Sequence, residues 1–181
     1  MDFRKHALLL AVIEQFHRSN EFPKSIHVQK AVSMLDSTGL FAMPFAYILY
    51  KHGPYSLDVE FELDQMQSYL AIYADPTPTF AQVLRIGRNG ALVKHKVPLS
   101  APDLAAITSV CRFLSRRPLP EIELLATAAW VWNREQLRIP IQIAGRLRAL
   151  KPYISDEDAL RRSREISDLA NRGQPRLERV G

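Results

Sequence analysis

The chain has 181 residues, a length that suits one compact domain or one domain with a helical appendage. Hydrophobic residues make up 47% and charged residues 24% of it, a composition that excludes disorder over most of the length. The longest apolar run, 7–13, is much shorter than the roughly 18 to 20 residues that span a bilayer. We therefore expect a cytoplasmic protein without membrane contact.

Positive charge is concentrated in the second half of the chain. Residues 1–90 hold 8 Lys and Arg against 9 Asp and Glu, whereas residues 91–181 hold 16 against 10. The formal net charge of +5 therefore comes from the C-terminal half. Such an asymmetry permits an acidic partner, whether nucleic acid or protein, without choosing between them.

Residues that carry enzyme chemistry are sparse. The single cysteine, Cys111, excludes an internal disulfide and a cysteine metal cluster, and its place in an apolar helical stripe predicts a buried thiol. The histidines lack metal-binding spacing, and the sequence has no phosphate-binding glycine loop and no nucleophile turn. We expect no metal, no cofactor and no enzymatic activity. His52 as a general base is the alternative within the enzyme class.

The first part of the chain predicts two helices and a strand. Apolar positions recur every three or four residues over 3–17 and again over 25–35, which is typical of amphipathic helices. Residues 45–50 are aromatic, apolar and few, as in a short strand. Gly53 and Pro54 then predict a turn.

A third helix and a hairpin follow. Ser56 is placed to cap the helix, whose apolar positions are Val59, Leu63, Met66 and Leu70. The proline-containing stretch 74–80 ends this helical region. Residues 83–96 form two β-type runs around Asn89-Gly90, a strong hairpin signal. Three helices and a hairpin in this order predict a winged-helix-like unit over 1–98.

The second half predicts further helices. Ser100 and Asp103 form a capping-box-like start, 116–120 reads as a linker, and Ser155 with Asp158 can cap the last helix. The expected helices after the linker are 121–134, 141–150 and 156–171. The predicted fold is mainly α: a winged-helix-like N-terminal half with a small β-hairpin, 1–98, packed against a helical C-terminal half, 99–172. Residues 173–181 are predicted to be a flexible basic tail.

Four short motifs resemble those of one protein family. They are Val28-Gln29-Lys30, the run 50–56 with its His-Gly-Pro-Tyr-Ser sequence, Glu123-Leu124-Leu125-Ala126-Thr127, and Leu150-Lys151-Pro152. In this order they resemble the YwgA-like group of bacterial proteins, relatives of the SocA or Panacea antitoxin domain. The resemblance spans roughly residues 5–170.

The resemblance implies a mostly helical, bacterial, cytosolic binding protein. Antitoxins of this broad family act by holding a toxin, and one member delivers its toxin to a protease. The resemblance therefore implies protein–protein contact, in toxin neutralisation or in an adaptor role. The resemblance does not fix the oligomeric state, and a homo-oligomer is compatible with it.

Two surfaces are candidates for contact with a protein. The first is the turn His52, Gly53, Pro54, Tyr55 and Ser56, where a helix start could receive a partner's carboxylate; a purely structural turn is the alternative. The second is the set of cations on the C-terminal helices, with Trp132 as the exposed one of two tryptophans. These cations are Arg112, Arg116, Arg117, Arg134, Arg138, Arg146, Arg148 and Lys151. A solvated basic face is the alternative there.

A DNA-binding regulator is the runner-up function. Arg85, Arg88, Lys94 and Lys96 lie on or beside the predicted hairpin and could contact phosphates as a wing does. The third helix opposes groove reading, because four carboxylates would face the phosphates. Those carboxylates are Asp58, Glu60, Glu62 and Asp64. The second helix, with His27, Gln29 and Lys30, is a weaker candidate for this role.

Overall fold

The computed structural model of the chain describes residues 2–76 and 82–173. This part of the chain is mainly helical, which confirms the predicted fold class. The helices are α1 (Phe3–Arg18), α2 (Ser25–Ser37), α3 (Leu57–Ser68), α4 (Gly90–Lys96), α5 (Ala101–Leu114), α6 (Leu119–Arg134), α7 (Pro140–Leu150) and α8 (Asp156–Gly173). Two antiparallel pairs of short strands accompany them: β1 (Ile48–Tyr50) with β2 (Gly53–Tyr55), and β3 (Ile72–Pro76) with β4 (Gln82–Ile86).

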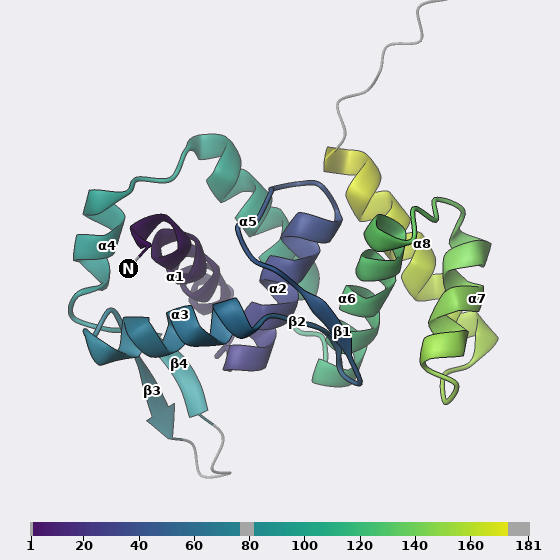
Figure 1. The fold of residues 1–181 in the computed structure, drawn as a ribbon, viewed down its shortest axis with the longest axis horizontal. Coiled ribbons are helices and arrows are strands. Elements are labelled where there is room, and N and C mark those ends of the chain that lie inside the picture. Colours follow the sequence, from purple (N-terminus) through teal and green to yellow (C-terminus); the bar gives the residue numbers. More distant parts are fainter. Residues whose placement is uncertain (1, 77–81, 174–181) are drawn as a thin grey trace, which may run out of the picture.

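The two ends of the molecule are joined by helices that run through its middle. Figure 1 shows α1, α3 and α4 with the β3–β4 pair at one end, α6, α7 and α8 at the other, and α2 and α5 between them. One hydrophobic core extends from α1 to α8, and α2 packs against both α5 and α6. The domain boundary predicted at residue 98 falls in the link between α4 and α5. The short hairpin β1–β2 lies between α3 and α6 (Figure 1).

Side-chain caps define the helix starts that the sequence predicts. Ser56 Oγ accepts a hydrogen bond from the Val59 amide at the start of α3. At α5, Ser100 and Asp103 form a reciprocal capping box. Ser155 Oγ accepts from the Asp158 amide at 3.0 Å at the start of α8. These three predictions are confirmed.

The hairpin predicted around Asn89-Gly90 is wrong. Strand β4 pairs instead with β3, with Ile72 opposite Ile86. Strand β3 begins at Ile72 and was not predicted from the sequence, which indicated only the end of a helical region there. Asn89 reaches back to the end of α3, because its side-chain amide donates to Tyr69 O at 2.6 Å and its backbone amide donates to the next carbonyl. These long-range bonds outweigh the local turn preference, and Gly90 begins helix α4.

The turn predicted at Gly53 and Pro54 is displaced by two residues. Lys51 and His52 make the turn, and Gly53 and Pro54 belong to β2, opposite Tyr50 and Leu49. Gly53 has φ +91°, a conformation that favours glycine, and this lets the strand begin directly after the tight turn.

The remaining predictions concern burial, membranes and the tail. Cys111 is buried, as predicted, and burial raises the pKa of its thiol. Across 2–76 and 82–173, no helix has the length and apolar character needed to cross a bilayer. Of the tail predicted at 173–181, only Gly173, which ends α8, belongs to the described residues.

Candidate functional site

The hairpin β1–β2 is bonded on one side to helix α2. The Gln29 side chain makes two hydrogen bonds to Ser56: its Nε2 donates to the Ser56 carbonyl at 2.9 Å, and its Oε1 accepts from the Ser56 amide at 3.0 Å. The adjacent Lys30 donates from Nζ to the Pro54 carbonyl at 2.8 Å. Both side chains are buried, and Lys30 is only 2% exposed. Helix α2 therefore fixes the backbone of the second strand.

The other side of the hairpin is bonded to α6 and to the link before α8. His52 Nδ1 lies 3.2 Å from Glu123 Oε2 on α6. Lys151, directly after α7, donates from Nζ to the Lys51 carbonyl. Two lysines from opposite sides thus bind two carbonyls of one short hairpin.

These contacts bring all four family-like motifs to one place. Gln29 and Lys30 come from the first motif, the hairpin itself is the second, Glu123 belongs to the third and Lys151 to the fourth. The sequence separates them by more than 120 residues. We call Gln29, Lys30, Glu123 and Lys151 the hairpin clamp.

The charges in the clamp are partly withdrawn from water. Burial lowers the pKa of Lys30 from 10.5 to about 8, a shift that Glu123 opposes and Lys151 reinforces. Burial also lowers the pKa of Lys151, again against the influence of Glu123. Glu123 thus acts on both lysines, and its carboxylate offsets part of the cost of burying their charge. The clamp is an electrostatically coupled unit.

The hairpin also approaches α6 through Gly53. A Cβ at residue 53 would lie 2.8 Å from Thr127 Oγ1 and 3.2 Å from the Glu123 carbonyl. Thr127 Oγ1 itself donates to that carbonyl at 2.7 Å. Glycine is therefore required here both for its φ and for the distance between β2 and α6.

Two histidine clusters bear on catalysis. The hydrogen-bond partner described for the exposed His52 is Glu123, whose carboxylate lies 3.2 Å from Nδ1. His6 is fully buried, with Nε2 2.7 Å from Glu62 Oε2 and Nδ1 2.8 Å from the Tyr69 hydroxyl. Burial, and then Glu62, raises the pKa of Tyr69, which disfavours the phenolate. The arrangement suits a buried bond network that joins α1 to α3.

Among the described residues, no group of three or more His, Cys, Asp or Glu side chains could hold a metal ion. Glu62, one of the four carboxylates predicted to face phosphates, is instead buried against His6 and Lys5.

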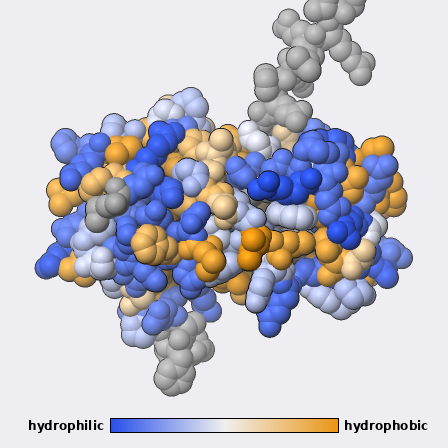
Figure 2. All heavy atoms as spheres, viewed as in Figure 1, coloured by the Kyte–Doolittle hydropathy of each residue, from blue (hydrophilic) through white to orange (hydrophobic). Residues whose placement is uncertain are grey.

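Large apolar side chains lie exposed on the outer surface of the hairpin and on the adjoining helix α3. They are Ile48 (56% exposed), Tyr50 (62%), Leu57 (69%) and Phe61 (60%). Figure 2 shows hydrophobic side chains gathered across α3 and the hairpin. Alternation puts Ile48 and Tyr50 on one side of β1, and Leu57 and Phe61 are one helical turn apart. We call these four residues the hairpin face.

Acidic groups and a small hollow adjoin the hairpin face. Asp58, Glu60 and Asp64 are exposed on α3, and Asp58 accepts a hydrogen bond from the Ala46 amide, which ties the chain before β1 to α3. A hollow of about 230 Å³ between α2 and the hairpin is lined by Ile26 and Tyr50 among others. The surface therefore combines apolar side chains, a recess and negative charge.

Most residues of the predicted turn site have little exposed surface. Gly53, Pro54 and Ser56 are buried, Tyr55 is half-buried, and only His52 is exposed. The structure brings them together with the clamp, as the structural alternative for this turn describes.

The prediction that Trp132 is exposed is wrong. Trp132 is 4% exposed, and Trp130 is the half-buried one of the two tryptophans. The cause is the position of α6 between α2 and α8, which leaves little of its surface open. The Arg138 guanidinium lies over the Trp132 ring, 4.6 Å from its centroid, and donates to the Trp132 carbonyl. Arg134 is exposed on the same helix.

Several cations of the predicted basic face are paired with acids of this same chain. Arg117 pairs with Glu121 and, at 2.7 Å, with Glu165; two further pairs are Arg146 with Glu135 at 2.8 Å and Arg148 with Asp156 at 2.5 Å. The C-terminal helices therefore present much less free positive charge than their composition suggests.

The four cations predicted for a wing lie on different elements. Arg85 on β4 is 2.6 Å from Asp75 and lies over the Phe22 ring. Arg88 is exposed in the link before α4. On α4, Lys94 is 3.0 Å from Glu14 and Lys96 lies over the Phe3 ring.

Sequence reasoning missed the hairpin face. Leu57 and Phe61 lie off the stripe of apolar positions that α3 buries, which is Val59, Leu63 and Met66. Large apolar residues on the polar side of an amphipathic helix are the signal that could have identified them.

Comparison with known proteins gives no family assignment: no protein-family model matches the chain, and no curated protein matches it. The proposed function therefore rests mainly on the geometry of the hairpin clamp and of the hairpin face.

Replacement of Gly53 by alanine should destabilise the protein more than replacement of Gly39. Both glycines have positive φ, +91° and +69°, but a Cβ at Gly39 meets no atom within 4 Å. Gly39→Ala should cost about 1 kcal/mol of unfolding free energy from strain alone, and Gly53→Ala roughly twice that or more. Urea unfolding of both variants measures the difference. Equal losses would contradict the close approach of β2 to α6.

The contribution of Lys30 to stability should rise with pH. Because its pKa is about 8 in the folded protein against 10.5 ordinarily, the folded state binds fewer protons than the unfolded state between these values. The unfolding free energy of the unsubstituted chain minus that of Lys30→Met should therefore increase from pH 8 toward pH 10.5. Urea unfolding across this range measures it, and a difference independent of pH would contradict the buried ammonium.

Proposed function

We propose that the chain is a non-catalytic binding protein that contacts another protein through the hairpin face. The observation that carries this proposal is the exposure of four large apolar side chains on a hairpin that the clamp holds in place. Contiguous exposed apolar surface on a folded protein marks an interaction site. The resemblance to the YwgA-like and SocA antitoxin-like proteins supports the same function, as toxin neutralisation or as an adaptor role.

Rigid support matters because association costs conformational freedom. A loose hairpin would have to be ordered at the moment of binding, whereas a preorganised one has already lost that freedom. Lys30 and Lys151 fix the backbone on two sides, and the Gln29 pair with Ser56 fixes the start of α3. Tyr50 and Phe61 are therefore presented as preorganised aromatic anchors, the residue class that dominates binding energy in protein interfaces.

The charge beside the hairpin face indicates the charge expected on the partner's contacting surface. Exposed Asp58, Glu60 and Asp64 border the apolar side chains on α3. A partner surface that carries Lys or Arg around an apolar centre complements this arrangement. The proposed partner is therefore a protein with a basic rim, in contrast to the acidic partner that the net charge alone favours.

The same carboxylates disfavour nucleic acid on this face, because phosphates would be repelled. DNA binding through Arg85, Arg88, Lys94 and Lys96 remains the alternative proposal. If DNA binds there, nucleic acid should be recovered with the chain at low salt. This recovery should be lost at high salt and in the variants Arg88→Ala and Lys94→Ala.

Substitution of the hairpin face should remove partner capture without loss of stability. Leu57→Ser and Phe61→Ser together should lower capture from nuclease-treated lysate at least about tenfold, since anchor side chains each contribute on the order of 1–2 kcal/mol. Both side chains are exposed, so the unfolding free energy should change by less than about 1 kcal/mol. A pull-down with quantified bands measures the capture.

Ile141→Ser is the matched control, because Ile141 is 63% exposed on α7, away from the hairpin. The proposal fails if this control lowers capture as much as the double variant does. It also fails if nucleic acid alone is recovered and disappears at high salt.

A further inference from the structure

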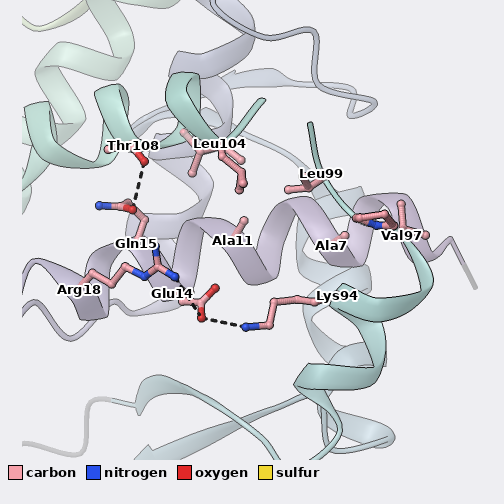
Figure 3. Close-up of a pocket in the computed structure, with 12 residues that line it drawn as sticks. Ala7, Ala11, Glu14, Gln15, Arg18, Lys94, Val97, Leu99, Leu104 and Thr108 are labelled. Atoms are coloured by element: carbon pink, nitrogen blue, oxygen red, sulfur yellow. Dashed lines mark hydrogen bonds and ion pairs between the residues drawn. The ribbon is translucent and has the colours of Figure 1, made fainter. Parts of the chain in front are cut away.

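A second hollow lies on the other side of the N-terminal half, between α1, α5 and the link that joins α4 to α5. Its volume is about 310 Å³, and apolar groups form most of its wall. Figure 3 shows Ala7 and Ala11 of α1 as its floor, Leu104 of α5 above them, and Val97 and Leu99 of the link at one end. The two alanines are one helical turn apart, and their small side chains leave the space that larger residues would fill.

The rim of this hollow is polar and carries a net positive charge. Lys94 Nζ lies 3.0 Å from Glu14 Oε1, and an Arg18 guanidinium nitrogen lies 3.8 Å from the same oxygen (Figure 3). Two cations thus share one carboxylate. At the end away from Leu99, Thr108 donates to Gln15 Oε1 at 3.2 Å and closes the wall. The hollow combines an apolar interior with a surplus cation at its mouth.

We propose that this hollow binds a small amphipathic carboxylate with an alkyl or aryl body. Ligand sites are typically concave and mostly apolar, with few polar groups that set orientation, as here. The apolar body would lie against Ala7, Ala11 and Leu104, and the carboxylate would bind Lys94 and Arg18 in competition with Glu14, which pairs with both. The volume holds roughly ten water-sized groups, which limits the ligand to a medium-length chain or a single substituted ring. None of these residues belongs to the hairpin face, so this site is independent of the proposed protein contact.

Titration with octanoate tests the proposal. Isothermal calorimetry, with amide chemical shifts as a second readout, should show saturable one-to-one binding that perturbs α1, α4 and α5. Octylamine, which has the same chain and the opposite charge, should bind at least about tenfold more weakly. Absence of saturable binding, or equal affinity for octylamine, would overturn the proposal.

Charge variants at the rim make the test specific. Lys94→Gln with Arg18→Gln should weaken octanoate at least about fivefold, whereas Glu14→Gln should strengthen it because the competing carboxylate is gone. Lys51→Gln removes a cation from the distant hairpin turn and should change nothing. Ala11→Leu fills the hollow and should abolish binding in protein that still unfolds cooperatively. Octanoate affinity that is the same in the unsubstituted chain and in both rim variants would overturn the site.

Discussion

The buried ammonium of Lys30 on the Pro54 carbonyl is the interaction on which the rest of the hairpin depends. Burial of a cation that is only 2% exposed is costly, and Glu123 together with the bond to the Pro54 carbonyl offsets part of that cost, so the pKa of Lys30 is still lowered to about 8. Lys151 repeats the arrangement at the Lys51 carbonyl from the opposite side. A three-residue strand pair is not stable alone, so these side chains supply what its own ladder cannot.

The clamp fixes which parts of the hairpin are bonded to the rest of the protein and which are exposed. The hairpin is bonded to α2 and α6, whereas the side chains of Ile48 and Tyr50 are exposed. Helix α3 starts directly after the hairpin, so the Gln29 bonds to Ser56 also set where Leu57 and Phe61 lie. The hollow over Ala7 and Ala11 is built on other helices, and two sites of different chemistry can therefore coexist in one small fold.

Local signals predicted the helices other than α4 and three of the helix caps, because the spacing of apolar residues and capping chemistry act over a few residues. Long-range bonds decided the rest. Asn89-Gly90 has the local chemistry of a hairpin turn, but bonds to the end of α3 place it at the start of a helix. Trp132 is buried on α6, a helix that packs against α2 and α8, which are distant in the sequence. The sequence shows the four motifs of the family resemblance and their order along the chain, whereas their convergence around Glu123 depends on the tertiary fold.

Site-specific photocrosslinking in living cells would reveal contact with a protein through the hairpin face. A photoreactive phenylalanine analogue at position 61 would lie in the proposed interface, and the same analogue at position 141 would lie on α7, outside it. We expect a discrete protein adduct from position 61 and none from position 141. Adducts of equal yield at both positions, or an adduct with nucleic acid alone, would contradict this expectation.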